Sequence, residues 1–264
     1  MAVGVVRYGA MGKSGVFSVP EGDVAAGSNV VVRTKRGVEW GWLLHVKPDE
    51  GGGEKVAGEV LRRATPADHE KQAGLVEKRQ AEEFEYCARL IKQYNLPMKL
   101  RIVEHLFGDD KIIYYFLSDG RVDFRGLVRD LAKQYRTRIE MRQIGVRDEA
   151  RMLGLVGPCG HELCCRRFLA ALKPVPMKMA KDQKSTLDPA KVSGSCGRLK
   201  CCLRFEEGLY EELKENLPRR GASVRTAEGN GTVLDYQILS QTVLVDLGDG
   251  ARHEFHINDV EVEK

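Results

Sequence analysis

Two copies of one cysteine-rich segment constrain this chain more than any other feature of its sequence. Residues 157–168 read GPCGHELCCRRF and residues 194–205 read GSCGRLKCCLRF, with seven identical positions at an offset of 37 residues. Self-similarity at a fixed offset indicates two copies of one structural unit. Each copy has a glycine that permits a tight turn, and two adjacent cysteines whose side chains point in different directions along an extended chain. The six cysteines of the repeat are Cys159, Cys164, Cys165, Cys196, Cys201 and Cys202.

Three kinds of chemistry are open to these six thiols. Disulfides are disfavoured because they are rare in a reducing cytosol, and a bond between adjacent cysteines closes a strained ring. A zinc site typically uses C-x(2–4)-C pairs and would leave one adjacent cysteine in each copy unused. Iron–sulfur ligation suits soft thiolates, and a four-iron cluster takes four of them. Three thiolates per copy are an incomplete set, so either one cluster takes four of the six or a partner protein supplies further ligands.

Other candidate side chains add little to this choice. His161 lies inside the first copy, but its counterpart in the second copy is Arg198, so we expect His161 to be a solvated loop residue. Nucleophilic catalysis needs one activated thiolate beside a base and gives no reason for six, whereas a redox sensor of adjacent thiols is a minor alternative. Cys87 shares a helical stripe with Phe84, Ile91 and Tyr94, which predicts a buried core thiol.

Composition excludes several classes of protein. The chain has 264 residues, of which 42% are hydrophobic and 30% charged, and these values are typical of a soluble globular protein. Apolar runs such as residues 112–117 are far shorter than the ~20 residues that a membrane span needs, and the first residues lack the apolar core of a signal peptide. No GxxxxGK[ST], GxSxG, HExxH or dinucleotide-binding glycine motif occurs. We therefore expect a cytoplasmic, non-enzymatic protein without membrane insertion.

The order of strand-like, turn-like and helix-like segments predicts an α+β protein. The first two of its parts cover residues 1–148. Residues 1–53 predict a small N-terminal β module, with turns at Glu21-Gly22 and Arg36-Gly37 and a glycine run at 51–53 that marks a linker or hairpin end. Its strands are expected at 3–8, 15–19, 29–34 and 39–46. Residues 54–148 follow the β-α-β-β-α-β order of a ferredoxin-like sandwich. Its elements are expected at 56–61 (strand), 66–94 (helix), 98–107 and 111–118 (strands), 124–135 (helix) and 138–144 (strand).

The regular pattern weakens in the third part, a cysteine-repeat metal-binding region at residues 149–217. Residues 157–205 contain four prolines and no long periodic segment. Their apolar content is thin, so we expect a metal centre or partner thiols to order them, followed by a short helix at 206–216. Residues 218–264 alternate again and predict a C-terminal SH3-like β barrel with Gly-Asn-Gly and Gly-Asp-Gly turns. Its strands are expected at 223–225, 231–237, 241–247 and 252–257.

Basic side chains gather in two places. Arg125, Arg129, Lys133 and Arg136 recur at spacings of four, four and three, which places them on one helical face. Such a stripe can hold RNA phosphates or an acidic partner helix, or it can be an ordinary solvated face. Residues 157–205 carry ten basic and three acidic side chains, a balance that suits RNA and equally offsets the negative charge of thiolates and a cluster.

Taken together, these motifs resemble the bacterial YaaT (RicT) family. The resemblance rests on residues 136–154 (RTRIEMRQIGVRDEARMLG), on the two cysteine segments and on residues 179–183 (MAKDQ), and it is most specific from about residue 122 to 205. Members of that family carry a C-terminal region first named from a yeast polymerase-suppressor protein. His161 stands where arginine is more usual.

This resemblance implies a function as well as a fold. It implies a cytoplasmic regulatory subunit that joins two small helical partners, the YlbF-like (RicF) and YmcA-like (RicA) proteins. Their complex carries 4Fe-4S clusters and modulates ribonuclease Y-dependent mRNA processing, with effects on sporulation, competence and biofilm formation. By resemblance, each of the six repeat cysteines inherits the role of cluster ligand. The competing hypothesis is a zinc-stabilised RNA-binding module.

Overall fold

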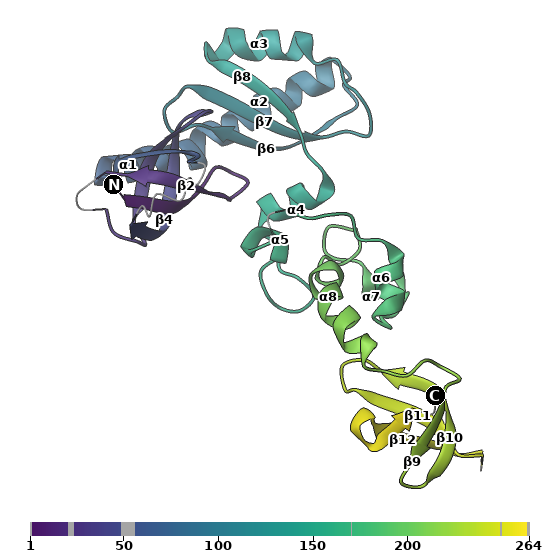
Figure 1. Ribbon diagram of the computed structural model, residues 1–264. Coiled ribbons are helices and arrows are strands. Elements are labelled where there is room, and N and C mark those ends of the chain that lie inside the picture. Colours follow the sequence, from purple (N-terminus) through teal and green to yellow (C-terminus); the bar gives the residue numbers. More distant parts are fainter. Residues whose placement is uncertain (1, 21–23, 49–55, 170, 249, 263–264) are drawn as a thin grey trace. The chain divides into compact units, whose positions relative to one another are not determined.

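The structure is a computed structural model that describes residues 2–20, 24–48, 56–169, 171–248 and 250–262. These residues form a mixed α+β chain with several sheets, as the sequence predicts (Figure 1). The chain divides into two compact units, Met1–Leu155 and Val156–Lys264, which are described separately below. The turn expected at Glu21-Gly22 and the glycine run at 51–53 lie outside the described residues. No helix in the described part of the chain is long and apolar enough to cross a membrane.

The N-terminal strands of the first unit close into a barrel. Strand β1 pairs with β4 to complete the order β1-β2-β5-β3-β4, and β2 pairs with β5 in parallel. The barrel interior is filled mainly by valines, because alternate residues of each strand face inward; its buried core is Val6, Phe17, Val19, Val30, Val32, Leu43 and Val60. The strands are β1 (Ala2–Tyr8), β2 (Lys13–Val19), β3 (Asn29–Thr34), β4 (Gly37–Pro48) and β5 (Gly58–Arg63).

Strand β5 corrects one prediction. The sequence order assigns residues 56–61 to a ferredoxin-like sandwich, and this assignment is wrong because β5 pairs with β2 and β3 of the barrel. A Cβ atom on Gly58 would lie 2.0 Å from the Arg33 carbonyl oxygen, so only glycine allows the strands to approach this closely. Val60 then points into the barrel core. The sandwich therefore keeps three strands instead of four.

The remaining three strands form a sheet in the order β6-β7-β8, covered on both faces. Strand β7 is central, antiparallel to β6 and parallel to β8. Its even-numbered residues Ile112, Tyr114 and Phe116 face the helices α2 and α3, while Ile113 and Tyr115 face a second apolar cluster on the opposite side. The elements are β6 (Lys99–His105), β7 (Lys111–Leu117), β8 (Arg138–Gln143), α2 (Gln80–Gln93) and α3 (Arg125–Tyr135).

The long helix predicted at 66–94 is confirmed as three consecutive segments, α1 (Pro66–Gly74), a π-helical turn η1 (Leu75–Arg79) and α2. A capping box starts it: the Thr65 hydroxyl accepts a hydrogen bond from the Asp68 backbone N–H, and the Asp68 carboxylate accepts one from the Thr65 N–H at 2.8 Å. A further short helix, α4 (Val146–Leu153), follows β8. The sequence reading did not predict α4, where the periodic pattern is short.

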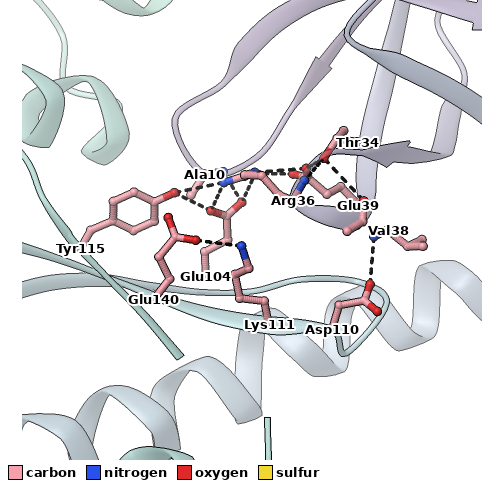
Figure 2. Close-up of polar contacts among 11 residues, drawn as sticks. Ala10, Thr34, Arg36, Val38, Glu39, Glu104, Asp110, Lys111, Tyr115 and Glu140 are labelled. Carbon is pink, nitrogen blue, oxygen red and sulfur yellow. Dashed lines mark hydrogen bonds and ion pairs between the residues drawn. The ribbon is translucent and has the colours of Figure 1, made fainter. Parts of the chain in front are cut away.

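A buried ionic network joins the barrel to the sheet within the first unit (Figure 2). The Arg36 guanidinium, in the β3–β4 turn, donates to both oxygens of Glu104 at 2.9 and 3.0 Å and to Glu39 at 3.1 Å. Glu104 also accepts from the Tyr115 hydroxyl at 2.6 Å and from the Ala10 N–H at 2.8 Å. Glu39 and Glu104 are only 2% and 6% exposed. Burial lowers the pKa of Arg36, but the two carboxylates outweigh it and raise that pKa overall.

Cys87 lies in the helix-facing core, as predicted, and burial raises the pKa of its thiol to about 12. Because the thiolate is the reactive form, we expect iodoacetamide at pH 8 to leave Cys87 unmodified in the native protein while it modifies the exposed Cys159. Peptide mass mapping after labelling measures both. Equal labelling of the two thiols would contradict a buried Cys87.

We also expect Cys87→Ser to lower the free energy of unfolding by about 1–3 kcal/mol, because it places a polar hydroxyl in an apolar core.

The C-terminal strands of the second unit form an antiparallel sheet in the order β12-β11-β10-β9-β13. The sequence predicts a closed SH3-like barrel for this part of the chain. In the described residues the edge strands β12 and β13 do not pair with each other, so the strand pairing leaves the sheet open. Strand β13 is too short for its pattern to be recognised in the sequence. The strands are β9 (Ser223–Thr226), β10 (Gly229–Gln237), β11 (Thr242–Asp246), β12 (Arg252–His256) and β13 (Val260–Val262). A short 3₁₀ turn, η2 (Ile257–Asp259), precedes β13.

The Gly-Asn-Gly segment of this sheet also differs from its prediction as a turn. It lies within β10, because Thr226 pairs with Gly229 and leaves Ala227 and Glu228 as the turn residues. A Cβ atom on Gly231 would lie 2.5 Å from Val245 Cγ1 and 2.6 Å from the Asp246 carbonyl oxygen. The glycine is therefore needed for close strand approach rather than for turning the chain.

Candidate metal centre

The cysteine repeat is a repeat in structure as well as in sequence. Each copy forms a small loop closed by a β-bridge, at Val156–Glu162 in the first and at the equivalent Ser193–Leu199 in the second. The same hydrogen bonds close both loops, from the Gly157 N–H to the His161 carbonyl and from the Gly194 N–H to the Arg198 carbonyl, each at 2.8 Å. Gly160 and Gly197 have φ of 80° and 73°, where glycine is favoured. The prediction of two copies of one unit is confirmed.

A helical turn follows the loop in each copy. The adjacent cysteines enter α5 (Cys164–Arg167) in the first copy and α8 (Cys202–Glu215) in the second. The Phe168 N–H donates to the Cys164 carbonyl at 3.0 Å, and the Phe205 N–H donates to the Cys201 carbonyl at 3.2 Å. Neighbouring side chains on a helix point about 100° apart. The two thiols of each pair therefore face different directions, but on a helical turn rather than on an extended chain.

The two copies pack against each other through equivalent residues. The Phe168 and Phe205 rings lie edge to face with centroids 5.2 Å apart, and the Ser195 hydroxyl donates to the Val156 carbonyl at 3.2 Å. Burial raises the pKa of the Cys202 thiol, and the nearby Glu206 and Cys164 raise it further. A thiol of the first copy thus lies close enough to a thiol of the second for their charges to interact.

The six thiols differ in exposure, and none of them forms a disulfide. Cys159 is exposed, Cys165 is buried, and the other four are half-buried. Within the described ranges, no three His, Cys, Asp or Glu side chains gather in an arrangement that could hold a metal ion. The donor set fits an iron–sulfur cluster chemically, since six soft thiols lie on two matched loops in contact with each other. The described residues of this chain thus do not by themselves bring a complete set of ligands together.

A small apolar cluster helps to order the cysteine region, which sequence reading did not foresee. Met179, Ala180, Val192 and Leu203 are buried together. They come from α8 and from two short helices, α6 (Met177–Asp182) and α7 (Pro189–Val192). The Gln183 side chain donates to the Leu203 carbonyl at 2.6 Å, which ties the linker between the copies to α8. These helices are too short for sequence periodicity to reveal them.

One basic side chain of the cysteine region, Lys184, binds residues of the C-terminal sheet. Lys184 Nζ contacts the Asp235 carboxylate and the Tyr236 carbonyl and lies 4.3 Å from the Tyr236 ring centre. Burial raises the pKa of Asp235, but hydrogen bonds from Lys184, from the Tyr236 backbone and from Arg220 outweigh it and bring that pKa to about 2. Lys184 therefore attaches the cysteine region to the C-terminal sheet instead of serving as a free cation. His161, by contrast, is an exposed loop residue, as predicted.

The predicted basic stripe lies on the exposed side of α3 in the first unit. Arg125, Arg129, Lys133 and Arg136 are all exposed. Arg125 pairs with Asp123 at 2.6 Å, and the helix ends at Tyr135, so that Arg136 adopts the left-handed conformation of a C-cap with φ of 51°. Three of the four residues thus form the stripe on the helix, and the fourth caps it. Its role in binding stays a prediction.

Comparisons with known proteins show which proteins the chain is similar to. The chain matches the family described as PSP1 C-terminal conserved region over residues 58–144, and the PSP1-like protein, third domain, over residues 174–217. The stage 0 sporulation protein YaaT of Bacillus subtilis is 43% identical over 245 residues, which cover 92% of this chain and 88% of that protein. An uncharacterized protein of Schizosaccharomyces pombe is 37% identical over 84 residues, or 31% of this chain and 11% of that one. No solved structure matches the chain.

Proposed function

The chain belongs to the PSP1 family that includes the stage 0 sporulation protein YaaT, and on that premise we propose that it is a non-enzymatic cytoplasmic regulatory subunit whose cysteine repeat binds iron–sulfur clusters. The observation that carries the proposal is the pair of matched segments, each a loop and a helical turn with three cysteines that form no disulfide, which contact each other. Thiolates are the ligands such clusters take, and a bound cluster would supply a centre that responds to iron and oxidants. The subunit would act through its partners and their control of mRNA processing.

Ligand counting supports partner proteins as part of the site. Two 4Fe-4S clusters take eight ligands, and the repeat offers six. Two equivalent but incomplete half-sites fit ligation by other chains better than one complete centre with two spare thiols. The proposed partners are YlbF-like and YmcA-like helical proteins, and the proposed target of the complex is ribonuclease Y, with sporulation, competence and biofilm formation as its downstream effects.

An exposed apolar surface next to the cysteines also supports partner docking. Phe168, Phe205 and Leu209 are 53%, 60% and 52% exposed, and the two rings touch. Contiguous apolar surface of this kind is typical of protein interfaces. The helix α8 that carries two of these residues is acidic, which favours a partner with basic side chains around an apolar face. Its acidic residues are Glu206, Glu207, Glu211, Glu212 and Glu215.

Co-purification with the two helical proteins tests this proposal. We expect the complex to form under anaerobic conditions and to dissociate after chelation of iron or exposure to oxygen, because metal–ligand bonds contribute to the association free energy. The variant with all six repeat cysteines changed to serine should fail to bind, and Cys87→Ser should bind normally. A complex that forms equally well with all six serines would refute ligation shared between chains.

A zinc-stabilised RNA-binding module is the second candidate function. The ten basic side chains of residues 157–205 favour it, since phosphate contacts dominate the affinity of proteins for RNA. The two candidates differ in the metal that the purified protein contains. A colourless protein with stoichiometric zinc would support the second candidate and exclude the first.

A further inference from the structure

The turn between β1 and β2 packs on the sheet face that lies opposite the helices α2 and α3. Ala10 and Met11 of this turn join the apolar cluster of Ile113 and Tyr115, and the Ala10 N–H bonds to Glu104 beside Tyr115 (Figure 2). The carbonyl oxygen of Gly12, two residues after Ala10, accepts a hydrogen bond from Arg151 Nη2 at 3.3 Å. The turn thus meets strand β7 and helix α4 at one place in the first unit.

Three cations from different parts of the sequence lie at this turn or beside the Tyr115 ring on which it packs. Lys13 directly follows Gly12 and begins β2. Arg142 comes from β8, and its guanidinium lies 5.9 Å from the Tyr115 ring centre. Arg151 comes from α4 and is held at Gly12 by the hydrogen bond described above. The fold therefore brings together one ammonium and two guanidinium groups.

Two carboxylates act on this cluster, Glu104 on Lys13 and Glu140 on Arg142, but each is already paired with another cation. Glu140 pairs with Lys111 at 2.8 Å, and Glu149 of α4 pairs with Arg101 at 2.7 Å. Glu104 is bound by Arg36, as described above. Among the described residues, no carboxylate forms an ion pair with Lys13, Arg142 or Arg151, and the buried Nε of Arg151 has no hydrogen-bond acceptor. The exposed Lys13 ammonium and the half-buried Arg142 guanidinium, which form no ion pair in the described residues, are thus left available to an anion.

Electrostatics within the cluster agree with this geometry. Burial lowers the pKa of Lys13, and the charges of Arg142, Arg36 and Arg151 lower it further, against a smaller opposing effect of Glu104. Like charges held together in a partly desolvated place cost free energy. A bound anion would offset that cost.

We propose that Lys13, Arg142 and Arg151 form a binding site for a phosphate group. Guanidinium groups match phosphate oxygens with paired hydrogen bonds, and an ammonium adds a compact charge. The phosphate can belong to an RNA backbone or to a small phosphorylated molecule. The site lies in the first unit and uses no cysteine, so it stands or falls independently of the proposed cluster.

The experiment measures binding of inorganic pyrophosphate and of a fluorescent single-stranded oligouridylate to the full chain. The test variant is Lys13→Gln, Arg142→Gln, Arg151→Gln, and the matched control is Lys35→Gln, Lys78→Gln, Lys92→Gln, three exposed lysines of the first unit whose replacement removes the same charge. We expect the test variant to lose at least about tenfold in affinity for pyrophosphate and the control to stay within about twofold of the wild type. With RNA, the slope of log affinity against log salt should fall by about 2 in the test variant, because each phosphate contact on a single strand contributes about 0.7.

The two ligands distinguish the sources of the phosphate. Pyrophosphate that binds and displaces RNA identifies a phosphate site used by RNA, whereas binding of pyrophosphate without RNA binding identifies a site for a small molecule. Lys13→Gln alone, whose side chain is exposed, should keep the fold and weaken binding by about threefold. Equal losses in the test and control variants, or no binding of either ligand by the wild type, would overturn the proposal.

Discussion

Changing both Cys164 and Cys201 to serine should abolish iron loading while the barrel and the three-stranded sheet stay folded. The two cysteines occupy equivalent positions in the two copies and stand at the start of equivalent helical turns. Serine keeps the size of the side chain but removes the soft thiolate that binds iron. Both residues lie in the second unit and take no part in the hydrophobic cores of the first. Iron and acid-labile sulfide, measured after anaerobic purification, give the result directly.

Cys87→Ser is the matched control for this experiment. It makes the same chemical change at a thiol that is buried in the helix-facing core of the first unit. Iron content should be unchanged in the control, and circular dichroism should be native-like in both proteins. If the double variant keeps the iron content of the wild type, both Cys164 and Cys201 must be removed from the set of ligands.

Removing the Arg36 side chain should cause the largest loss of stability among the substitutions considered. Arg36→Ala would leave two buried carboxylates, Glu39 and Glu104, without their shared cation. Leaving a buried charge unpaired typically costs about 3–5 kcal/mol. Urea denaturation followed by tryptophan fluorescence measures the loss, because both tryptophans lie in the same unit, on β4.

Arg33→Ala provides the control for Arg36→Ala. Arg33 also lies in the barrel and pairs with Glu59 at 2.8 Å, but their side chains are 60% and 48% exposed. Exposed ion pairs contribute about 1 kcal/mol or less, so this variant should be nearly as stable as the wild type. Similar losses in the two variants would show that burial does not determine how much the Arg36 network contributes to the free energy of unfolding.

Local sequence patterns were sufficient for most elements of this fold. The strand at 29–34 and the helical segment at 66–94 agree with the structure because alternation and capping signals act over short distances. The buried thiol of Cys87 also follows from helical spacing alone. The internal repeat was visible from residue identities before its loops were seen.

Features that depend on long-range contacts could not be predicted from these patterns. A strand's pattern does not say which sheet it joins, and β5 therefore joined the barrel rather than the sandwich. Arg36 and Glu104 are 68 residues apart, and no local signal links them. The same holds for Lys13, Arg142 and Arg151, which only the tertiary fold brings together.

The repeat that carries the candidate ligands follows from the sequence, but the packing of its two copies does not. The edge-to-face contact between Phe168 and Phe205 joins the two copies, and sequence reasoning did not foresee it. A signal was present, because phenylalanine is one of the seven identities between the copies. An aromatic residue retained at the same position of both copies is a candidate for the contact between them.

The central claim is that the cysteine repeat holds an iron–sulfur cluster. The most direct test is to express the full chain with its helical partners, purify the complex without oxygen, and record its visible absorption together with its iron, acid-labile sulfide and zinc content. We predict a brown complex with equal amounts of iron and sulfide, both of which are lost when all six repeat cysteines are changed to serine. A colourless complex that contains zinc, or iron that persists in the six-serine variant, would contradict the claim.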